Sequence, residues 1–321
     1  MIGVYLWLYG LTFAACFLLT PVITLLAERL RIVDLPDARK IHVERVARLG
    51  GAAFVLVWLG AVTWLYLTGQ FGPGNSRLVP GLIIGCALIA LVGVADDWRG
   101  LPSRVKLLLQ TAAALVFLMV GAPTAVSNGL WFAVALFWLV LITNAFNLID
   151  GLDGLAIGLA AVAATGFAVL GFIGDGRLLF LSSLALLGVC LSFLPYNWYP
   201  ARVFMGDVGS HFLGFALASL GLIALADKNQ TGGLVVPLLF MAVPVFDTAL
   251  SIIRRILNKK PLFAADKSHF YNLLMNRGLS HRGSVLFCYG LASAFATAGL
   301  VLGPVLPGAA GSEPATGRGH G

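Results

Sequence analysis

Charged residues are scarce in this 321-residue sequence. Asp, Glu, Lys and Arg make up 11% of the chain, whereas an ordinary soluble domain carries about 25%. Hydrophobic residues make up 59% and come in continuous runs of about 20 residues, unlike the alternating ten-residue strands of a membrane β-barrel. A soluble protein could not cover so much apolar surface. The composition therefore excludes a soluble enzyme, a disordered chain and a nucleic-acid-binding protein, and it predicts an all-α polytopic membrane protein.

Cysteine is also scarce. The chain has four cysteines, which lie singly inside apolar runs and form no C-x-x-C pair: Cys16, Cys86, Cys190 and Cys288. We interpret them as small buried side chains and not as a disulfide framework or metal ligands. The N-terminus lacks a basic segment, and its apolar run is longer than the core of a signal peptide. We therefore expect a first transmembrane helix there and not a cleaved signal.

Ten apolar segments have the length of a membrane span. They cover roughly residues 3–26, 49–69, 79–95, 105–121, 129–147, 155–174, 178–194, 208–226, 233–256 and 283–304. We expect one transmembrane domain over residues 1–304 with its active site on the cytoplasmic face. The Gly-, Pro- and Ala-rich end, residues 305–321, is predicted to be a disordered tail.

The basic residues lie mostly on one side of the predicted bundle. Connections after the odd-numbered spans hold 17 of the Lys and Arg residues, and the opposite side holds 4. Because cytoplasmic loops are enriched in Lys and Arg, this split places the odd connections in the cytoplasm and both termini outside. The same connections carry most of the polar residues, so any chemistry should face the cytoplasm.

Five carboxylates lie at the cytoplasmic ends of predicted spans: Asp96 and Asp97 after the third, Asp150 and Asp153 after the fifth, and Asp207 before the eighth. Few bases lie near them in the sequence, and acids at that depth are costly unless a cation compensates them. An all-oxygen ligand set favours Mg²⁺ or Mn²⁺ over zinc. The pattern predicts a divalent-cation site of the kind that phosphate-ester chemistry uses.

Several of these residues also have a purely structural interpretation. Asp207 is a natural N-cap, and the amides that follow it could bind a phosphate. Asn144 and Asn147 could form a polar clamp between helices. His211 is expected to be a packed polar residue. Asp247, deep in the ninth span, needs a partner, which is either structural or part of a substrate.

Two loops combine bases with aromatic residues or glycines. The first contains Lys40 and His42 and leads to Gly50 and Gly51, and the second, residues 257–282, contains His269 and Arg282. Lys, Arg and His suit the phosphates of a nucleotide. The alternative for both is an ordinary basic cytoplasmic loop. Since no large extramembrane segment is predicted, one substrate is expected to be a lipid.

Several strings resemble one known family. VADDWRGL, NAFNLIDGLDGLA, MGDVGSHFLG and the DKSH…GLSHR loop are similar to those of the polyprenyl-phosphate N-acetylhexosamine-1-phosphate transferases. The resemblance covers residues 1–304 and is strongest to the bacterial undecaprenyl-phosphate GlcNAc-1-phosphate transferases of the WecA/TagO type, with MraY-type enzymes as more distant relatives. It implies transfer of a sugar 1-phosphate from a UDP-N-acetylhexosamine to undecaprenyl phosphate, Mg²⁺ as cofactor and a place in the bacterial cytoplasmic membrane.

The resemblance also implies residue roles. The DD pair matches acids assigned to lipid-phosphate activation or metal binding, the DGLDG acids match positions near the metal and the pyrophosphate, and the GDVGS acid matches a Mg²⁺ ligand. We accordingly predict catalytic roles for Asp96, Asp97, Asp150 and Asp153; metal binding by Asp207 and Asp150; and substrate binding by Lys40, His42, Asn144, Asn147, His269 and Arg282.

The sequence departs from the family in three places. His269-Phe270-Tyr271-Asn272 stands where the family often has H-x-H-H, no proline follows the first-loop His42 closely, and an eleventh span is missing. These departures leave the sugar open among GlcNAc, GalNAc, a deoxy-hexosamine and MurNAc-pentapeptide. A carboxylate-coupled transporter is the alternative outside the family, but its acids would lie near the bilayer midplane, often in repeated halves. We expect no nucleic-acid partner, and a homodimer is compatible with the sequence.

Overall fold

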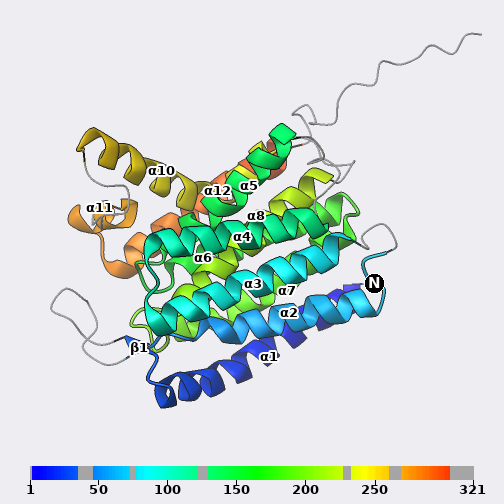
Figure 1. Ribbon diagram of the computed structural model, residues 1–321, viewed down its shortest axis with the longest axis horizontal. Helices are drawn as coiled ribbons and strands as arrows, with labels where there is room; N and C mark the ends of the chain where they lie inside the picture. The colour runs from blue at the N-terminus through cyan, green and yellow to red at the C-terminus, as the bar shows by residue number, and fades with distance from the viewer. Residues whose placement is uncertain are drawn as a thin grey trace, which may run out of the picture.

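The computed structural model describes residues 2–34, 46–72, 77–121, 129–226, 233–259 and 269–303. Long helices lie side by side and form one bundle (Figure 1). Among the described helices, eight are long and apolar enough to cross a membrane, and α2 is a shorter apolar helix. The predicted all-α polytopic membrane fold is confirmed.

The helices of the bundle follow the predicted spans closely. They are α1 (Ile2–Arg29), α2 (Gly51–Leu67), α3 (Leu78–Arg99), α4 (Ser103–Gly121), α5 (Gly129–Ile149), α6 (Leu155–Ile173), α7 (Arg177–Asn197), α8 (Gly206–Ala226) and α12 (His281–Leu302). Their boundaries are visible in the sequence because apolar runs of this length end at Gly, Pro or charged residues.

The ninth predicted span is not a single helix, and this prediction is wrong. α9 (Val235–Phe240) ends at Met241, and α10 (Ala242–Leu257) then begins and leads away from the bundle toward the short helix α11 (Phe270–Asn276) (Figure 1). Pro244 lies in the first turn of α10, where its missing N–H costs no hydrogen bond. Hydropathy runs unbroken through Met241, so hydropathy alone shows no interruption there.

α8 is the most deeply buried of the spans, with 94% of its apolar window inside the bundle. Its first turn packs directly on α2 and α3 at glycines. A Cβ added at Gly51 would collide with the backbone of Gly209, and one at Gly93 would collide with the backbone of Val208. The start of α8 is thus held between the start of α2 and the end of α3.

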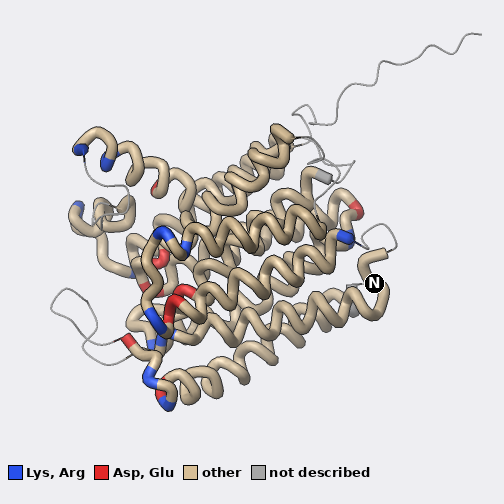
Figure 2. The backbone as a smooth tube through the Cα atoms, in the orientation of Figure 1, with Lys and Arg blue, Asp and Glu red and all other residues tan. Residues whose placement is uncertain are grey.

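Most of the charged residues lie toward one end of the bundle (Figure 2). The short strands β1 (Val33–Asp34) and β2 (Val46–Ala47) pair antiparallel at this end, and the N-terminus lies at the opposite end (Figure 1). Lys40, His42 and the predicted tail lie outside the described residues.

Candidate active site

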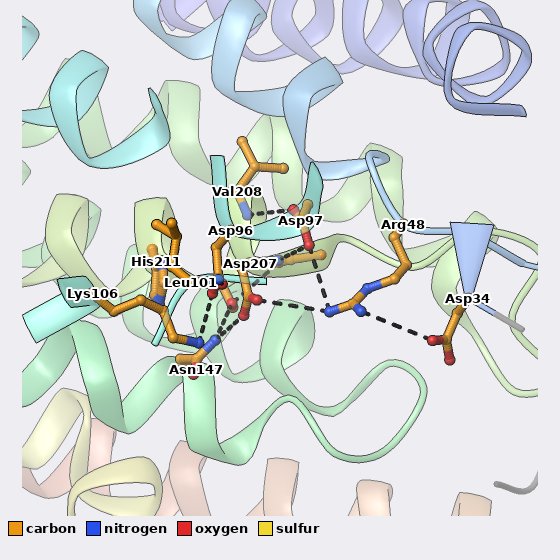
Figure 3. Close-up of polar contacts among 12 residues, drawn as sticks. Asp34, Arg48, Asp96, Asp97, Leu101, Lys106, Asn147, Asp207, Val208 and His211 are labelled. Atoms are coloured by element: carbon orange, nitrogen blue, oxygen red, sulfur yellow. Dashed lines mark hydrogen bonds and ion pairs between the residues drawn. The ribbon is translucent and has the colours of Figure 1, made fainter. Parts of the chain in front are cut away.

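The five acids predicted to meet do lie at the charged end of the bundle. Asp96 and Asp97 are in the last turn of α3, Asp207 is in the first turn of α8, and Asp150 and Asp153 flank the turn between α5 and α6. Figure 3 shows the first three side chains close together. The acids therefore form one cluster, although their chemical roles remain predictions.

Asp97 binds the start of α8. Its Oδ1 accepts a hydrogen bond from the backbone N–H of Asp207 at 2.9 Å, and its Oδ2 accepts one from the N–H of Val208 at 2.9 Å. The Asp97 side chain is fully buried. The expectation that Asp207 caps its own helix is therefore wrong, because Asp97 supplies the cap. The same contacts leave these two amides unavailable to a phosphate.

Asp207 is consequently free to face the neighbouring helices. Asn147 Nδ2 donates to Asp207 Oδ1 at 2.5 Å and to Ser210 Oγ at 3.0 Å. The carboxyl groups of Asp207 and Asp96 lie next to each other (Figure 3). Two carboxyl oxygens and an amide from three helices thus meet at one point (Figure 3).

Two cations compensate these acids. Lys106 Nζ, from the first turn of α4, lies 2.6 Å from Asp96 Oδ2. Arg48 Nη2 lies 3.6 Å from Asp97 Oδ1 and 3.7 Å from Asp207 Oδ2, and Arg48 Nη1 lies 3.9 Å from Asp34 Oδ1. The cluster is thus not poor in bases, contrary to the impression from the sequence.

Neither cation was among the predicted site residues. Lys106 is a lysine one turn into an apolar span, a position that is costly unless an acid pairs with it, so its placement was a usable signal. Arg48 looked like one of several loop bases, and the sequence alone does not distinguish it from them. Arg48 reaches Asp97 and Asp207 from a segment distant in the chain, whereas Lys106 reaches Asp96 from the next helix (Figure 3).

The turn between α5 and α6 carries the other two acids. Burial, then the charges of Asp207 and Asp97, raise the pKa of Asp150 well above its usual value. Asp153 Oδ2 accepts a hydrogen bond from the N–H of Ala201 at 2.9 Å, so this carboxylate braces the segment before α8. The Tyr271 hydroxyl lies in the space that a Cβ at Gly151 would occupy, which places α11 directly on the turn.

Asn144 points into the bundle. Its Nδ2 donates to Gln110 Oε1 at 2.7 Å, and Gln110 Nε2 lies 3.2 Å from Nε2 of the fully buried His211. These three side chains form the interhelical polar clamp that the sequence left open as an alternative. The placement gives no support to substrate binding by Asn144, whereas Asn147, three residues later, does reach the acidic cluster.

His269 directly precedes α11, and Arg282 lies in the first turn of α12. His269 Nδ1 is 2.7 Å from Asp247 Oδ2, and the Phe270 N–H donates to Asp247 Oδ1 at 2.6 Å. The buried Asp247 thus has a partner within the protein, His269, as its position inside the predicted span requires. The exposed Arg282 donates twice to the Tyr199 carbonyl, at 3.2 and 2.8 Å, and so ties the start of α12 to the segment before α8.

Comparison with known proteins places this arrangement in a family. Residues 79–225 match the model of glycosyl transferase family 4. Over 297 residues, 89% of this chain and 81% of its relative, the sequence is 38% identical to a probable undecaprenyl-phosphate N-acetylglucosaminyl 1-phosphate transferase of Bacillus subtilis. The chain belongs to glycosyl transferase family 4. The resemblance noted in the sequence is confirmed at the level of the family.

Two further relatives have names that specify a related lipid or sugar. A decaprenyl-phosphate N-acetylglucosaminephosphotransferase of Mycobacterium leprae is 33% identical over 322 residues, covering 88% of this chain and 80% of that protein. A phospho-N-acetylmuramoyl-pentapeptide-transferase of Staphylococcus haemolyticus is 28% identical over 306 residues, covering 86% and 93%. The matched family segment contains all five clustered acids.

The acidic cluster supplies only part of the set of ligands that a magnesium ion needs. Within the described ranges, no three His, Cys, Asp or Glu side chains converge as a complete metal site. Mg²⁺, however, is usually bound by one or two carboxylates, water and substrate phosphates, and not by an all-protein cage. The adjacent carboxyl groups of Asp96 and Asp207 match that oxygen-only, two-carboxylate arrangement.

Proposed function

We propose that this protein transfers N-acetylhexosamine 1-phosphate from a UDP-sugar, most specifically UDP-GlcNAc, to undecaprenyl phosphate. The products are UMP and a lipid-linked sugar pyrophosphate that initiates a cell-envelope glycan. Family membership supports the reaction class, and the named activities of the Bacillus and Mycobacterium relatives support GlcNAc as the sugar. The observation that carries the proposal is the cluster of Asp96, Asp207, Lys106 and Arg48 at one end of a membrane-spanning bundle.

The bond changes need no oxidant and no proton acceptor. An oxygen of the lipid phosphate attacks the phosphorus that carries the sugar. A new P–O bond forms, the bond from that phosphorus to the UMP oxygen breaks, and UMP leaves with the electron pair as an anion. Because a phosphate monoester is already ionised at pH 7, the protein mainly has to position the reactants and neutralise their charge. We favour this direct attack over a covalent aspartyl intermediate.

The residues of the site have distinct tasks in this reaction. Lys106 and Arg48 provide positive charge for the two phosphate groups, at the same place where they now face acids. Asp96 and Asp207, with Asp150 nearby, would hold Mg²⁺, which when bound neutralises pyrophosphate oxygens. Asn147 orients the Asp207 carboxylate. His269, held by Asp247, would contact the nucleotide sugar.

The site also requires access to two phases. We propose that the charged end faces the cytoplasm of a bacterium, that the bundle lies in the cytoplasmic membrane, and that both termini are outside. Apolar side chains exposed on α10, namely Phe246, Leu250 and Ile253, would then meet the acyl chains of the bilayer near the site. A water-soluble UDP-sugar can approach from one side and a polyprenyl chain from the other.

The test is direct. The purified protein is given undecaprenyl phosphate and a panel of UDP-sugars, with Mg²⁺, with Mn²⁺ or with EDTA, and the lipid product is identified by mass together with released UMP. We expect GlcNAc-1-phosphate transfer that EDTA abolishes and that Asp207→Asn reduces at least about 100-fold. Product with another sugar only would correct the donor. Full activity in Asp207→Asn or in EDTA would contradict the assigned site, and substrate flux in proteoliposomes without a UDP-sugar would instead favour a transporter.

A further inference from the structure

The two adjacent acids of the Asp96–Asp97 pair have different surroundings. We propose that Asp97 is a positioning residue: it caps helix α8 from the neighbouring helix α3 and thereby holds Asp207 in place, without contacting a substrate. The tests of this proposal that measure activity rest on the proposed function, whereas the tests of the helix cap itself do not.

Two backbone hydrogen bonds and an ion pair with Arg48 occupy the Asp97 carboxylate, whose Oδ1 lies 3.6 Å from Arg48 Nη2. Both oxygens accept backbone N–H groups at 2.9 Å, one oxygen each, and the side chain has no exposed surface. The N–H groups of the first helical turn have no partner within their helix. A buried helix start therefore needs an acceptor, and Asp97 satisfies two of these donors at once while its charge faces the positive end of the helix dipole.

The glycine at the start of α8 explains why the cap comes from another helix. Gly206 has φ +68°, a conformation that favours glycine, and it has no side chain with which to cap. A Cβ built on Gly206 would lie 2.5 Å from Asp97 Oδ2 and would also collide with the Arg48 carbonyl oxygen. The Asp97 carboxylate thus occupies the space in which a local capping side chain would have to lie.

Asp96 has the opposite character. Successive residues of a helix point about 100° apart, so Asp96 does not face the backbone N–H groups of α8 that Asp97 binds. Its Oδ2 contacts the partly exposed Lys106, its Oδ1 accepts the Leu101 N–H at 2.7 Å, and its carboxyl group adjoins that of Asp207. Of the two acids, Asp96 is the one whose carboxyl group lies beside that of Asp207, the residue assigned to the metal.

Capping from α3 also fixes Asp207. The residue whose N–H binds Asp97 Oδ1 is Asp207 itself, and its side chain points to Asn147 on the far side. The Asp97 bonds and the contact of Gly93 with the Val208 backbone set the rotation of the first turn of α8. If this cap is lost, the turn can rotate or fray, and the Asp207 carboxylate leaves the position next to Asp96.

Asp97→Asn tests the proposal, with Asp96→Asn as the matched control. Four quantities are measured on detergent-purified protein: Mn²⁺ binding by electron paramagnetic resonance, the melting temperature, kcat and KM. Asparagine can accept only one of the two N–H groups and turns a donor toward the other. We expect Asp97→Asn to weaken Mn²⁺ binding about 10-fold to 100-fold, as loss of a group that orients a metal ligand does, and to lower Tm by roughly 2–5 °C.

The kinetic constants distinguish a positioning role of Asp97 from direct contact of Asp97 with a substrate. A displaced Asp207 lowers kcat and raises the Mg²⁺ concentration needed for half-maximal rate, while KM for the lipid and the UDP-sugar stays within about twofold. An Asp97→Asn protein with wild-type Tm and wild-type Mn²⁺ affinity but without turnover would overturn the proposal, because that pattern requires direct participation of Asp97 in the chemistry.

Hydrogen exchange supplies a test that depends neither on activity nor on recovery of the Asp97 variant. Exchange is followed by mass spectrometry with residue-level fragmentation in the wild-type chain and in Asp96→Asn. We expect the amides of residues 207 and 208 to be protected in both proteins, although amides in a first helical turn otherwise exchange readily. Rapid exchange at both amides in the wild type would exclude the cap, even if the sugar-phosphate transferase assay succeeds. Protection there together with failure of that assay would leave the cap standing and count against the proposed function alone.

Discussion

Lys106 lies in the first turn of α4 and contacts Asp96 of the acidic cluster. About a quarter of its side chain is exposed, while the Asp96 side chain that it contacts at 2.6 Å is almost entirely buried. A buried carboxylate needs such a partner, because removal of one member of a buried pair leaves an uncompensated charge. The residue thus serves the stability of the site before any substrate arrives, and its ammonium group remains close enough to the surface to meet a phosphate.

Lys106→Met should therefore destabilise the protein and weaken binding of an anionic substrate. We expect a loss of roughly 2 kcal/mol, below the 3–5 kcal/mol typical of fully buried pairs because Lys106 is partly solvated, and a KM for the lipid phosphate raised about tenfold. Thermal unfolding in detergent and steady-state kinetics measure the two effects. The double variant Lys106→Met/Asp96→Asn should recover most of the stability but no activity. An unchanged Tm in the single variant would show that Asp96 does not depend on this lysine.

At the scale of single residues, the sequence predicted which acids gather but not what each one binds. Asp96 and Asp97 are chemically identical neighbours, and only the direction of each side chain assigns one to Lys106 and the other to the amides of α8. Arg48 could not be separated from the other loop bases, since its contacts with Asp97 and Asp207 join segments distant in the chain. Asn144 and Asn147 looked equivalent, yet one turns toward Gln110 and the other toward Asp207.

At the scale of helices, α8 is positioned by close approach of backbones. Gly93 of α3 lies against the backbone of Val208, one turn before the Asp97 cap on the same helix. Small residues let membrane helices approach closely, and packing there has no hydrophobic driving force to compensate a gap. The distance between α3 and α8 therefore determines whether the Asp97 carboxylate can reach the N–H groups of residues 207 and 208.

Gly93→Ala should push α3 and α8 apart, because the added methyl group would overlap backbone atoms that cannot move individually. We expect a lower Tm, in line with the roughly 1–3 kcal/mol typical of overpacking, and loss of most activity through the displaced start of α8. Gly290→Ala is the matched control: it lies within the long helix α12, and a Cβ there meets no atom within 4 Å. Equal behaviour of the two variants would show that the α3–α8 contact does not position the site.

The long helices were predictable from hydropathy, since a bilayer sets their length and apolar character. The interruption at Met241 was not, because both α9 and α10 are apolar enough to read as one span. α10 differs in that Asp247, Ser251 and Arg255 are buried on one side while Phe246 and Ile253 are exposed on the other. This amphipathic pattern within the apparent span was the available signal, and it indicates a helix that lies partly along a surface.

At the scale of the whole molecule, the distribution of charge supports the proposed membrane orientation. Charged residues concentrate at the end that holds the acidic cluster (Figure 2). Bacterial inner-membrane proteins keep Lys- and Arg-rich loops in the cytoplasm. A UDP-sugar, a charged cytoplasmic metabolite by its chemistry, can reach the cluster only if this end faces inward. The proposed reaction therefore requires the orientation that the charge distribution supports, with the acidic cluster facing the cytoplasm.

Cysteine labelling tests that orientation directly. The four natural cysteines are buried, so the wild-type chain should give little background with a membrane-impermeant maleimide. Arg104 and Arg177 are both exposed and lie at the starts of α4 and α7, which the predicted topology assigns to opposite sides of the membrane. We expect Arg177→Cys to react in intact cells and Arg104→Cys to react only after permeabilisation. The reverse pattern would place the acidic cluster outside, where it could not use a cytoplasmic UDP-sugar, and the proposed donor would have to be abandoned even if the fold and the cluster were as described.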